Sequence, residues 1–302
     1  MRRRHGLVLI GVLITVTACG TQETERQTGQ QAPEAAAPTS PGTSAVRYVA
    51  LGDSYTSAPG AGKAVGSPAG CGRTEVNYPR LVAESLRATE FTDASCGGAT
   101  TADLTRPQRT PEGTNPAQID AVTPETTLVT IGIAGNDVGL VAAAATCTTT
   151  DPNATPCRDQ LGDRGTTRFD AAIADAADRV GSVLGKVAEK APKARVVLVG
   201  YPAVVPDDGN ACWPELPYSP SDVEFLRQGL DQLNGQLSDK AREHGAEFAE
   251  TTSFTEGHGM CAPAEQRWIE GPRSSTETAP LHPNARGEKA MAEAVLHVIG
   301  QV

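Results

Sequence analysis

The stretch Val46-Arg-Tyr-Val-Ala-Leu-Gly-Asp-Ser-Tyr-Thr56 decides which fold this chain adopts. It begins with an apolar run of β-branched and aromatic residues, Val46 to Leu51, and this run ends at a glycine. Such a run predicts a buried β-strand. Ser54 follows directly after the turn, where open α/β sheets bind their ligands, outside the carboxyl ends of the strands. Ser54 is therefore a candidate functional residue, although this stretch alone leaves open a strand followed by an ordinary polar turn.

Strand-like and helical segments alternate along the rest of the chain. Strands that alternate with helices indicate parallel βαβ units. The expected fold is therefore α/β, a three-layer α/β/α sandwich around a five-stranded parallel sheet. Further apolar runs predict strands at 126–133 and 195–200, and short, weaker strands are expected at 90–94 and 246–249. Apolar residues at helical spacing predict helices at 78–88, 138–146, 168–190 and 284–299.

One more helix is indicated by its end signals. Pro220 suits the first helical position, and Ser221 with Glu224 has the spacing of a capping box. Gly245 is expected to end this helix. The segment 147–157 between two of the other helices is polar and contains two prolines, so a loop is expected there.

The charge of the chain excludes some classes of partner. The 302 residues carry a formal net charge of -10 and are 39% apolar. A nucleic-acid binder needs a basic surface, and electrostatic docking on anionic lipid needs one too. We therefore expect no nucleic-acid partner and no direct electrostatic contact with a membrane. No feature indicates an oligomer, and a monomer is expected.

The N-terminus has the pattern of a signal peptide, expected over residues 1–18. A basic segment precedes an apolar run, Leu7 to Val16, which is too short to span a bilayer. Val16-Thr-Ala-Cys19 also resembles the bacterial lipobox, and this resemblance implies cleavage before Cys19 and acylation of its thiol. An ordinary secretory signal, with Cys19 incidental, is the alternative. The protein is thus expected at the outer face of the cell membrane, held only by its lipid anchor, or secreted.

The segment after Cys19 lacks the residues that a folded core needs. Residues 20–44 contain no large apolar side chain and are rich in Gln, Thr, Pro and Ala. Such a composition predicts a flexible linker. We therefore expect a lipidated cysteine and linker over 19–45, and a folded domain over 46–302.

Six cysteines remain when Cys19 is set aside. An even count in an exported chain suggests three disulfides, and six cysteines allow 15 connectivities. There is no CxxC pair and no histidine at ligand spacing, so no metal site is expected. We predict the sequential pairing, Cys71–Cys96, Cys147–Cys157 and Cys212–Cys261.

Several segments that follow predicted strands, and one near the C-terminus, carry residues suited to ester hydrolysis. This chemistry needs a nucleophile, a base and donors for the tetrahedral oxyanion. Ser54 supplies a hydroxyl, and His282 titrates near neutrality and is able to take its proton. The N–H groups of Ser54 and Gly98, together with the amide of Asn136, would make three donors.

This set resembles the SGNH/GDSL hydrolase family. Its four blocks would be Gly52-Asp53-Ser54, Gly98, Gly135-Asn136-Asp137 and His282, in the order of the family. The segment Cys96-Gly-Gly-Ala-Thr-Thr101 and the six cysteines are most similar to the secreted actinobacterial esterases and lipases. The resemblance implies a flavodoxin-like sheet and a serine nucleophile. It also implies an oxyanion hole formed by Ser54, Gly98 and Asn136, and chemistry without metal or cofactor.

One position departs from the family pattern. The family usually has an aspartate three residues before the histidine, and this chain has Ala279 there. A backbone carbonyl near Ala279 is the first candidate to accept the Nδ1–H of His282, which would make a Ser–His dyad. Glu277 is the second candidate. His258 is the rival to His282 as the base.

The sequence therefore predicts a serine esterase or lipase that hydrolyses small-molecule or lipid acyl esters through an acyl-Ser54 intermediate. A carbohydrate O-deacetylase with the same machinery is one alternative, and a catalytically inactive, lipid-tethered binding protein is another. Three aromatic residues are candidates to line the substrate cleft or to pack on the Cys212–Cys261 disulfide: Trp213, Tyr218 and Trp268.

Overall fold

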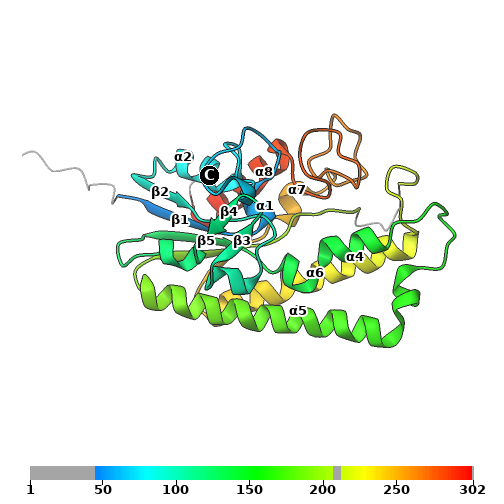
Figure 1. Ribbon diagram of the computed structural model, residues 1–302, viewed down its shortest axis with the longest axis horizontal. Helices are drawn as coiled ribbons and strands as arrows, with labels where there is room; N and C mark the ends of the chain where they lie inside the picture. Colours follow the sequence, from blue (N-terminus) through cyan, green and yellow to red (C-terminus); the bar gives the residue numbers. More distant parts are fainter. Residues whose placement is uncertain (1–44, 207–211, 301–302) are drawn as a thin grey trace, which may run out of the picture. The chain divides into compact units, whose positions relative to one another are not determined.

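Five parallel strands form the central sheet, in the order β2-β1-β5-β6-β7 (Figure 1). They are β1 (Arg47–Gly52), β2 (Glu90–Asp93), β5 (Leu128–Gly132), β6 (Arg195–Val199) and β7 (Glu247–Ala249). All four neighbouring pairs run parallel. This computed structural model describes residues 45–206 and 212–300. The five-stranded parallel sheet expected from the sequence is confirmed.

The chain divides into two units, Met1–Thr43 and Ser44–Val302. The first unit lies outside the described residues. The expected signal peptide, Cys19 and nearly all of the expected linker therefore lie there as well. Within the described part of the chain, no helix is long and apolar enough to cross a membrane.

Alternate residues of the strands enter two different core layers. One set packs with the apolar stripes of α5 (Cys157–Lys190) and α6 (Pro220–Glu243). The other set packs with α2 (Tyr78–Ser85) and α8 (Ala285–Val298). The first set is Val49, Leu51, Val129, Ile131 and Leu198, and the second is Tyr48, Ala50, Leu128, Val197 and Val199.

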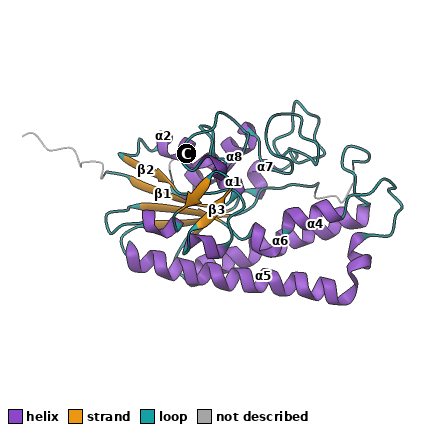
Figure 2. Ribbon diagram, viewed as in Figure 1, coloured by secondary structure: helices purple, strands orange, loops and turns teal. Residues whose placement is uncertain are grey.

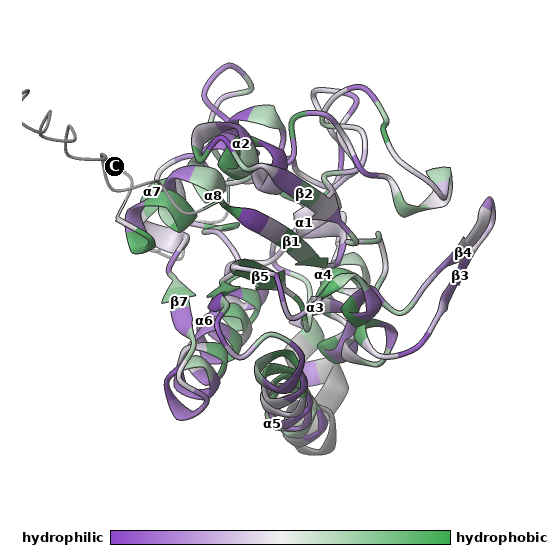
Figure 3. Cartoon of the chain, turned by 90° about the vertical axis from the view of Figure 1, so that its left-hand side faces the viewer, coloured by the Kyte–Doolittle hydropathy of each residue, from purple (hydrophilic) through white to green (hydrophobic). Residues whose placement is uncertain are grey.

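This alternation follows from the two-residue period of a β-strand, whose successive side chains point to opposite faces. A sheet buried on both faces needs helices on both sides. Figures 1 and 2 show the result, with α5 and α6 on one face and α2 and α8 on the other. The central strands β1 and β5 carry largely hydrophobic colours (Figure 3). The three-layer α/β/α sandwich is therefore confirmed.

Helix ends differ from the expected ones at two places. α5 begins at Cys157 and not at 168, because its first three turns carry no apolar stripe that the sequence could reveal. α6 is capped by Ser219, whose Oγ accepts from the N–H of Asp222 at 3.2 Å. The predicted capping box of Ser221 and Glu224 is therefore wrong. Ser221 already lies inside the helix, because Pro220 occupies the first helical position.

Short elements fill the loops at the carboxyl edge of the sheet. A hairpin of β3 (Gln108–Thr110) and β4 (Gly113–Asn115) was not predicted, because its strands are short and mostly polar. The expected helix at 138–146 is two helices, divided at Gly139, whose φ is +71°. The short elements are α1 (Ser54–Ser57), η1 (Ala69–Cys71), η2 (Thr101–Leu104), η3 (Gln118–Ala121), α3 (Gly135–Val138), α4 (Leu140–Thr146) and α7 (Thr252–Thr255).

Three disulfide bonds fasten these loops. They join Cys71 to Cys96, Cys147 to Cys157 and Cys212 to Cys261, which is the sequential pairing that we predicted. The first bond links η1 to the segment that follows β2, and Gly97 next to it donates its N–H to Cys71 O at 2.9 Å. The loop that carries Gly98 is therefore held against the loop that follows Ser54.

Candidate active site

Ser54 and His282 lie in direct contact at the carboxyl edge of the sheet. Ser54 is the first residue of α1, immediately after β1, and His282 lies in the loop before α8. The distance between Ser54 Oγ and His282 Nε2 is 2.7 Å. Both residues are mostly buried, with exposed fractions of 9% and 8%. A hydroxyl within hydrogen-bond reach of an imidazole is the arrangement of an activated nucleophile.

The loop of His282 is held from several sides. Tyr55 donates its O–H to Leu281 O at 2.5 Å, and the N–H of Glu270 donates to His282 O at 2.9 Å. Asn284 caps α8, since its Oδ1 accepts from the N–H of Arg286 at 3.0 Å. The imidazole is therefore fixed by the start of a helix and by the residue that follows Ser54.

The second ring nitrogen of His282 has a backbone partner. Nδ1 lies 2.7 Å from Pro280 O, one residue after Ala279, whereas the side chain of Glu277 belongs to an exposed residue. A carbonyl only accepts, so Nδ1 carries the proton and Nε2 is the acceptor of the Ser54 hydroxyl. Burial lowers the pKa of His282 below its usual 6.5, and the bond to Pro280 opposes this shift. The imidazole is therefore neutral at neutral pH, the state that a general base requires.

Asp53 organises the turn that presents Ser54. Its carboxylate accepts from the N–H of Tyr55 at 2.9 Å and from the O–H of Tyr201 at 2.5 Å. Burial raises the pKa of Asp53 to about 7, and these two donors oppose the rise. Tyr201 Oη in turn accepts from the N–H of Gly135 at 2.6 Å. A Cβ at Gly135 would lie 2.8 Å from Tyr201 Oη, so only glycine fits there.

The loop that carries Gly98 lies between the Ser54 turn and Asn136. The N–H of Cys96 donates to Gly52 O at 3.0 Å, and Asn136 Nδ2 donates to Ala99 O at 2.9 Å. Gly98 has a φ of +75°, a conformation that favours glycine. Among the described residues, neither the N–H of Gly98 nor that of Ser54 has an acceptor. Neither of these two backbone donors is thus used within the described part of the chain.

Asp137 completes the support of this loop. Its carboxylate accepts from the N–H of Thr101 at 2.9 Å and from the Thr101 hydroxyl at 2.6 Å. Arg179 of α5 forms an ion pair with it at 3.2 Å. Asp137 therefore connects α3, the Gly98 loop and α5. The sequence assigned it no role of its own and gave no signal for Thr101 or Arg179.

Tyr201 is a further residue of the site that the sequence analysis did not identify. It follows the predicted strand at 195–200 directly, so its place at the carboxyl edge was a usable signal. It bridges Asp53 and Gly135, and thereby links the loops after β1, β5 and β6.

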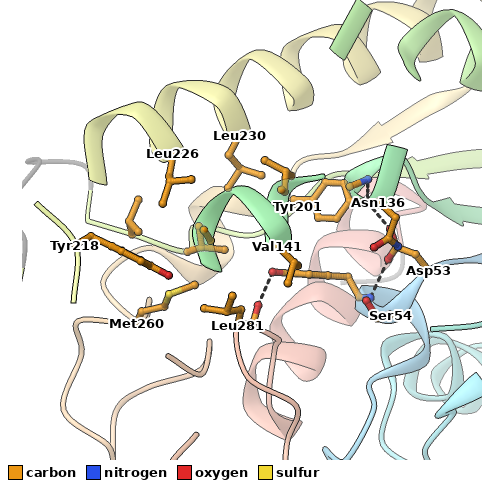
Figure 4. Close-up of a pocket in the computed structure, with 16 residues that line it drawn as sticks. Asp53, Ser54, Asn136, Val141, Tyr201, Tyr218, Leu226, Leu230, Met260 and Leu281 are labelled. Carbon is orange, nitrogen blue, oxygen red and sulfur yellow. Dashed lines mark hydrogen bonds between the residues drawn. The ribbon is translucent and has the colours of Figure 1, made fainter. Parts of the chain in front are cut away.

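A largely apolar pocket opens next to Ser54 (Figure 4). It holds about 640 Å³ of space, counting the part that is open to solvent. Its walls come from the Ser54 turn, α3, α4, the loop after β6, α6 and the loop before α8. The apolar side chains among them are Leu140, Val141, Ala144, Val204, Val205, Leu226, Leu230, Met260 and Leu281.

The rival base and two of the three aromatic candidates from the sequence do not line this pocket, whereas the third does. His258 stacks on Trp268 with ring centroids 3.6 Å apart, and its Nδ1 lies 2.7 Å from Gln266 O. The partner of Ser54 is therefore His282 and not His258. Tyr218 lines the pocket, whereas Trp213 and Trp268 are not among its lining residues.

One group of potential metal ligands lies close together in the described part of the chain. It consists of Cys147, Cys157 and Asp222. The two sulfurs are joined in a disulfide, and a carboxylate oxygen of Asp222 accepts from the N–H of Cys157 at 2.7 Å. A metal needs thiolates, which a disulfide does not offer, so these residues do not fit a metal ion.

The fold and this arrangement define an ester hydrolase, and the comparison with protein families agrees. Residues 50–290 match the GDSL-like lipase/acylhydrolase family, and the chain belongs to that family. It is an enzyme, a serine hydrolase of the lipase/esterase class. The family resemblance seen in the sequence is thereby confirmed.

The relatives are lipases and esterases from Streptomyces. Lipase 2 of Streptomyces coelicolor is 37% identical over 297 residues, covering 95% of both chains. A lipase of Streptomyces rimosus is 30% identical, covering 84% of this chain and 86% of that one. Among solved structures, an extracellular lipase from Streptomyces rimosus has a TM-score of 0.68 at 28% identity, covering 84% of this chain and 100% of that one. A phospholipase A1 from Streptomyces albidoflavus has a TM-score of 0.70 at 26% identity, covering 84% and 99%.

Proposed function

We propose that this protein is an exported, lipid-anchored serine esterase or lipase that cleaves acyl esters through an acyl-Ser54 intermediate. The observation that carries the proposal is the 2.7 Å contact between Ser54 Oγ and His282 Nε2 at the mouth of an apolar pocket. Ser54 is the nucleophile and His282 the base. The lipase names of the relatives support an ester substrate with a hydrocarbon chain.

The reaction proceeds in two halves. His282 Nε2 takes the proton of Ser54 as Oγ attacks the ester carbonyl, and the tetrahedral intermediate collapses when His282 protonates the leaving alcohol. Water then attacks the acyl-enzyme with His282 as its base, and the carboxylic acid leaves. Neutral imidazole is needed at the start of each half, and the lowered pKa of His282 supplies it.

Three donors stabilise the charge that forms on the ester oxygen. They are the N–H groups of Ser54 and Gly98 and the side-chain amide of Asn136. One N–H of the Asn136 amide is used by Ala99 O at 2.9 Å, which orients the side chain and leaves the other N–H for the oxyanion. Such donors act most strongly where they are held in place before the charge develops.

The apolar lining of the pocket favours a longer acyl chain over an acetyl group. Nine aliphatic or thioether side chains line the pocket, and a two-carbon acetyl group would touch few of them. Burial of hydrocarbon is favourable by about 0.8 kcal/mol for each CH₂ group. We therefore prefer a lipase or esterase to a carbohydrate O-deacetylase. The substrate is a small-molecule or lipid ester, and the enzyme acts as a monomer.

Covalent capture tests the assignment of the nucleophile. A fluorophosphonate phosphorylates an activated serine and leaves ordinary serines unmodified, because only an activated hydroxyl is sufficiently nucleophilic. We expect one labelled site, in the peptide that contains Ser54. A label on any other peptide, or no label on a folded sample, would remove the proposal.

The catalytic group is a dyad in which a backbone carbonyl replaces the usual acid. We expect Glu277→Gln to keep kcat/KM within about twofold, because Nδ1 of His282 donates to Pro280 O. The pH profile of kcat/KM should rise to a plateau with a midpoint below 6.5 in both forms, since burial lowers the pKa of His282. Steady-state kinetics from pH 4.5 to 8 measure both. A loss of several orders of magnitude in Glu277→Gln would show that the carboxylate takes part.

The anchor is proposed from the sequence around Cys19. Disulfides form in oxidising compartments, and the three bonds here support export. We expect the wild-type protein to incorporate a clickable fatty acid and to pellet with membranes, and Cys19→Ala to do neither. Residues 1–18 are proposed as the signal peptide, 19–45 as the lipidated linker and 46–302 as the catalytic domain. A wild-type protein free of fatty acid would favour an ordinary secretory signal.

A further inference from the structure

The apolar pocket contains one hydroxyl whose hydrogen-bonding capacity is unused. Tyr218, in the segment between β6 and α6, is fully buried, with an exposed fraction of 0%. Its Oη forms no hydrogen bond with any residue that the structure describes. Burying a hydroxyl without a partner is unfavourable, because it loses its bonds to water and gains none in return. Such a group needs an explanation, and a partner that binds at the site is one.

The place of this hydroxyl in the pocket indicates what kind of partner it has. Figure 4 shows Tyr218 at the opposite end of the pocket from Ser54, with its oxygen directed into the pocket interior. The walls between the two are apolar and include Val141, Leu281 and Met260. Burial raises the pKa of Tyr218 to about 12, so the group stays protonated and is able both to donate and to accept.

The other four tyrosines of the chain show that this is an exception. Tyr48 bonds Thr130 Oγ1 at 2.7 Å, and Tyr55 donates to Leu281 O at 2.5 Å. Tyr78 bonds Thr56 Oγ1 at 3.4 Å, and Tyr201 donates to Asp53. Among the five tyrosine hydroxyls, only that of Tyr218 lacks a partner in the described part of the chain. The unused bond therefore belongs to the pocket and not to the packing of tyrosines in general.

We propose that Tyr218 selects ester substrates whose chain carries an oxygen atom, as a hydroxyl or a carbonyl group, at the depth of the pocket where its hydroxyl lies. This inference rests on the proposed function, since it requires an ester held at Ser54 with one chain in this pocket. A plain hydrocarbon chain gains from the apolar walls but leaves Tyr218 unpaired. A chain with an oxygen at the right carbon gains both the apolar contacts and a hydrogen bond to Tyr218. The difference in binding free energy between the two chains is the basis of selectivity.

A cycle of two enzymes and two substrates tests the proposal. p-Nitrophenyl esters of one chain length are compared, one plain and the others with a single hydroxyl or keto group at successive carbons beyond the first few. When the oxygen stands at the carbon that reaches Tyr218, we expect Tyr218→Phe to lower kcat/KM for that ester by about two- to tenfold. This factor corresponds to one net hydrogen bond. The plain ester should be hydrolysed by Tyr218→Phe at least as fast as by the wild type. The cycle isolates the bond between the two oxygens from other effects of the substitution.

A matched control separates this effect from a general loss of packing. Tyr48→Phe removes an equally buried hydroxyl, but one that bonds Thr130 in the core layer under α2 and α8. It should lower Tm and leave all substrate ratios unchanged, whereas Tyr218→Phe should leave Tm unchanged or raise it, because no bond within the protein is lost.

Two results would overturn the proposal. In one, Tyr218→Phe changes the plain and the oxygenated esters by the same factor at every position. In the other, no oxygenated chain distinguishes the two enzymes, which would mean that the hydroxyl bonds only water. If the wild type hydrolysed no ester in the series, the proposed function would fall and this inference with it. That outcome is distinguishable, because it affects the plain esters too.

Discussion

Ser54→Ala should lower kcat for a chromogenic acyl ester by about 10⁴- to 10⁶-fold and should abolish fluorophosphonate labelling. In the proposed mechanism this hydroxyl attacks the ester carbonyl, and among the described residues its side-chain partner is His282 Nε2 at 2.7 Å. Removing it leaves the donors of the oxyanion hole and the pocket, which retain a small rate above that of water. Kinetics with p-nitrophenyl esters and mass spectrometry of labelled peptides measure the two effects.

Nucleophile and base act as a unit, which gives a second test of the same assignment. The double variant Ser54→Ala with His282→Ala should be about as slow as Ser54→Ala alone, because the base has no proton to take once the hydroxyl is gone. Losses that add, so that the double variant is slower by the product of two factors, would show that His282 acts independently of Ser54.

Ser57 provides a matched control on the same short helix. It is fully buried, and its Oγ has no partner among the described residues. Ser57→Ala should therefore keep both activity and the fluorophosphonate label, with Tm unchanged or slightly raised. Retention of activity in Ser54→Ala, or loss of it in Ser57→Ala, would place the nucleophile elsewhere.

Asn136→Ala should lower kcat by about 10²- to 10³-fold with little change in KM. In the proposed mechanism the second N–H of its amide bonds charge that exists only in the transition state, so its loss affects the rate more than substrate binding. Asn136→Asp is expected to be no better than Asn136→Ala, because a carboxylate donates no hydrogen bond and repels the oxyanion. Separate determination of kcat and KM for both variants checks this.

Asn136 also holds the Gly98 loop through Ala99 O, so loosening of the loop must be distinguished from loss of a donor. Asn115 offers the comparison. Its amide donates to Ala94 O at 3.1 Å, at the start of the segment that leads to Gly98, and accepts from Arg73 at 2.9 Å. Asn115→Ala should lower Tm while kcat falls far less. Equal losses of kcat in the two variants would assign Asn136 a positioning role only.

Local patterns were sufficient to predict the sheet and its layers. The runs at 46–51, 126–133 and 195–200 are apolar on both faces, and they became strands buried on both sides. Such runs carry their own signal, because only a strand covered by helices on both faces buries every residue. The edge strand β2 and the short β7 were also found, because each follows a helical pattern and is bounded by turn residues. The hairpin of β3 and β4 was missed, because mostly polar residues on a small exposed ribbon leave no periodic pattern.

The residues of the site also fall into two groups, those that local sequence patterns indicated and those whose roles depend on distant partners. Local sequence patterns indicated four of them: a serine or asparagine after a strand (Ser54, Asn136), a glycine pair (Gly98) and a histidine before a helix (His282). The roles of Tyr201, Asp137 and Arg179 depend on partners 36 to 148 positions away in the chain. The strand before Tyr201 marked its position, but no local pattern predicted the partners of the three residues. The sequence did predict a backbone carbonyl near Ala279 as the partner of His282 Nδ1, and the structure identifies it as Pro280 O at 2.7 Å.

The amino-acid sequence alone was enough to establish the number and direction of the strands, the alternation with helices and the residue types needed for ester cleavage. These features depend on composition and on spacing of two or 3.6 residues, which act over a few neighbours. Tertiary structure was needed to show the sheet order β2-β1-β5-β6-β7, the contact between Ser54 and His282 across 228 positions, and the unpaired hydroxyl of Tyr218 in the pocket. Those features arise from long-range packing, in which each loop takes its place only after its distant neighbours have taken theirs.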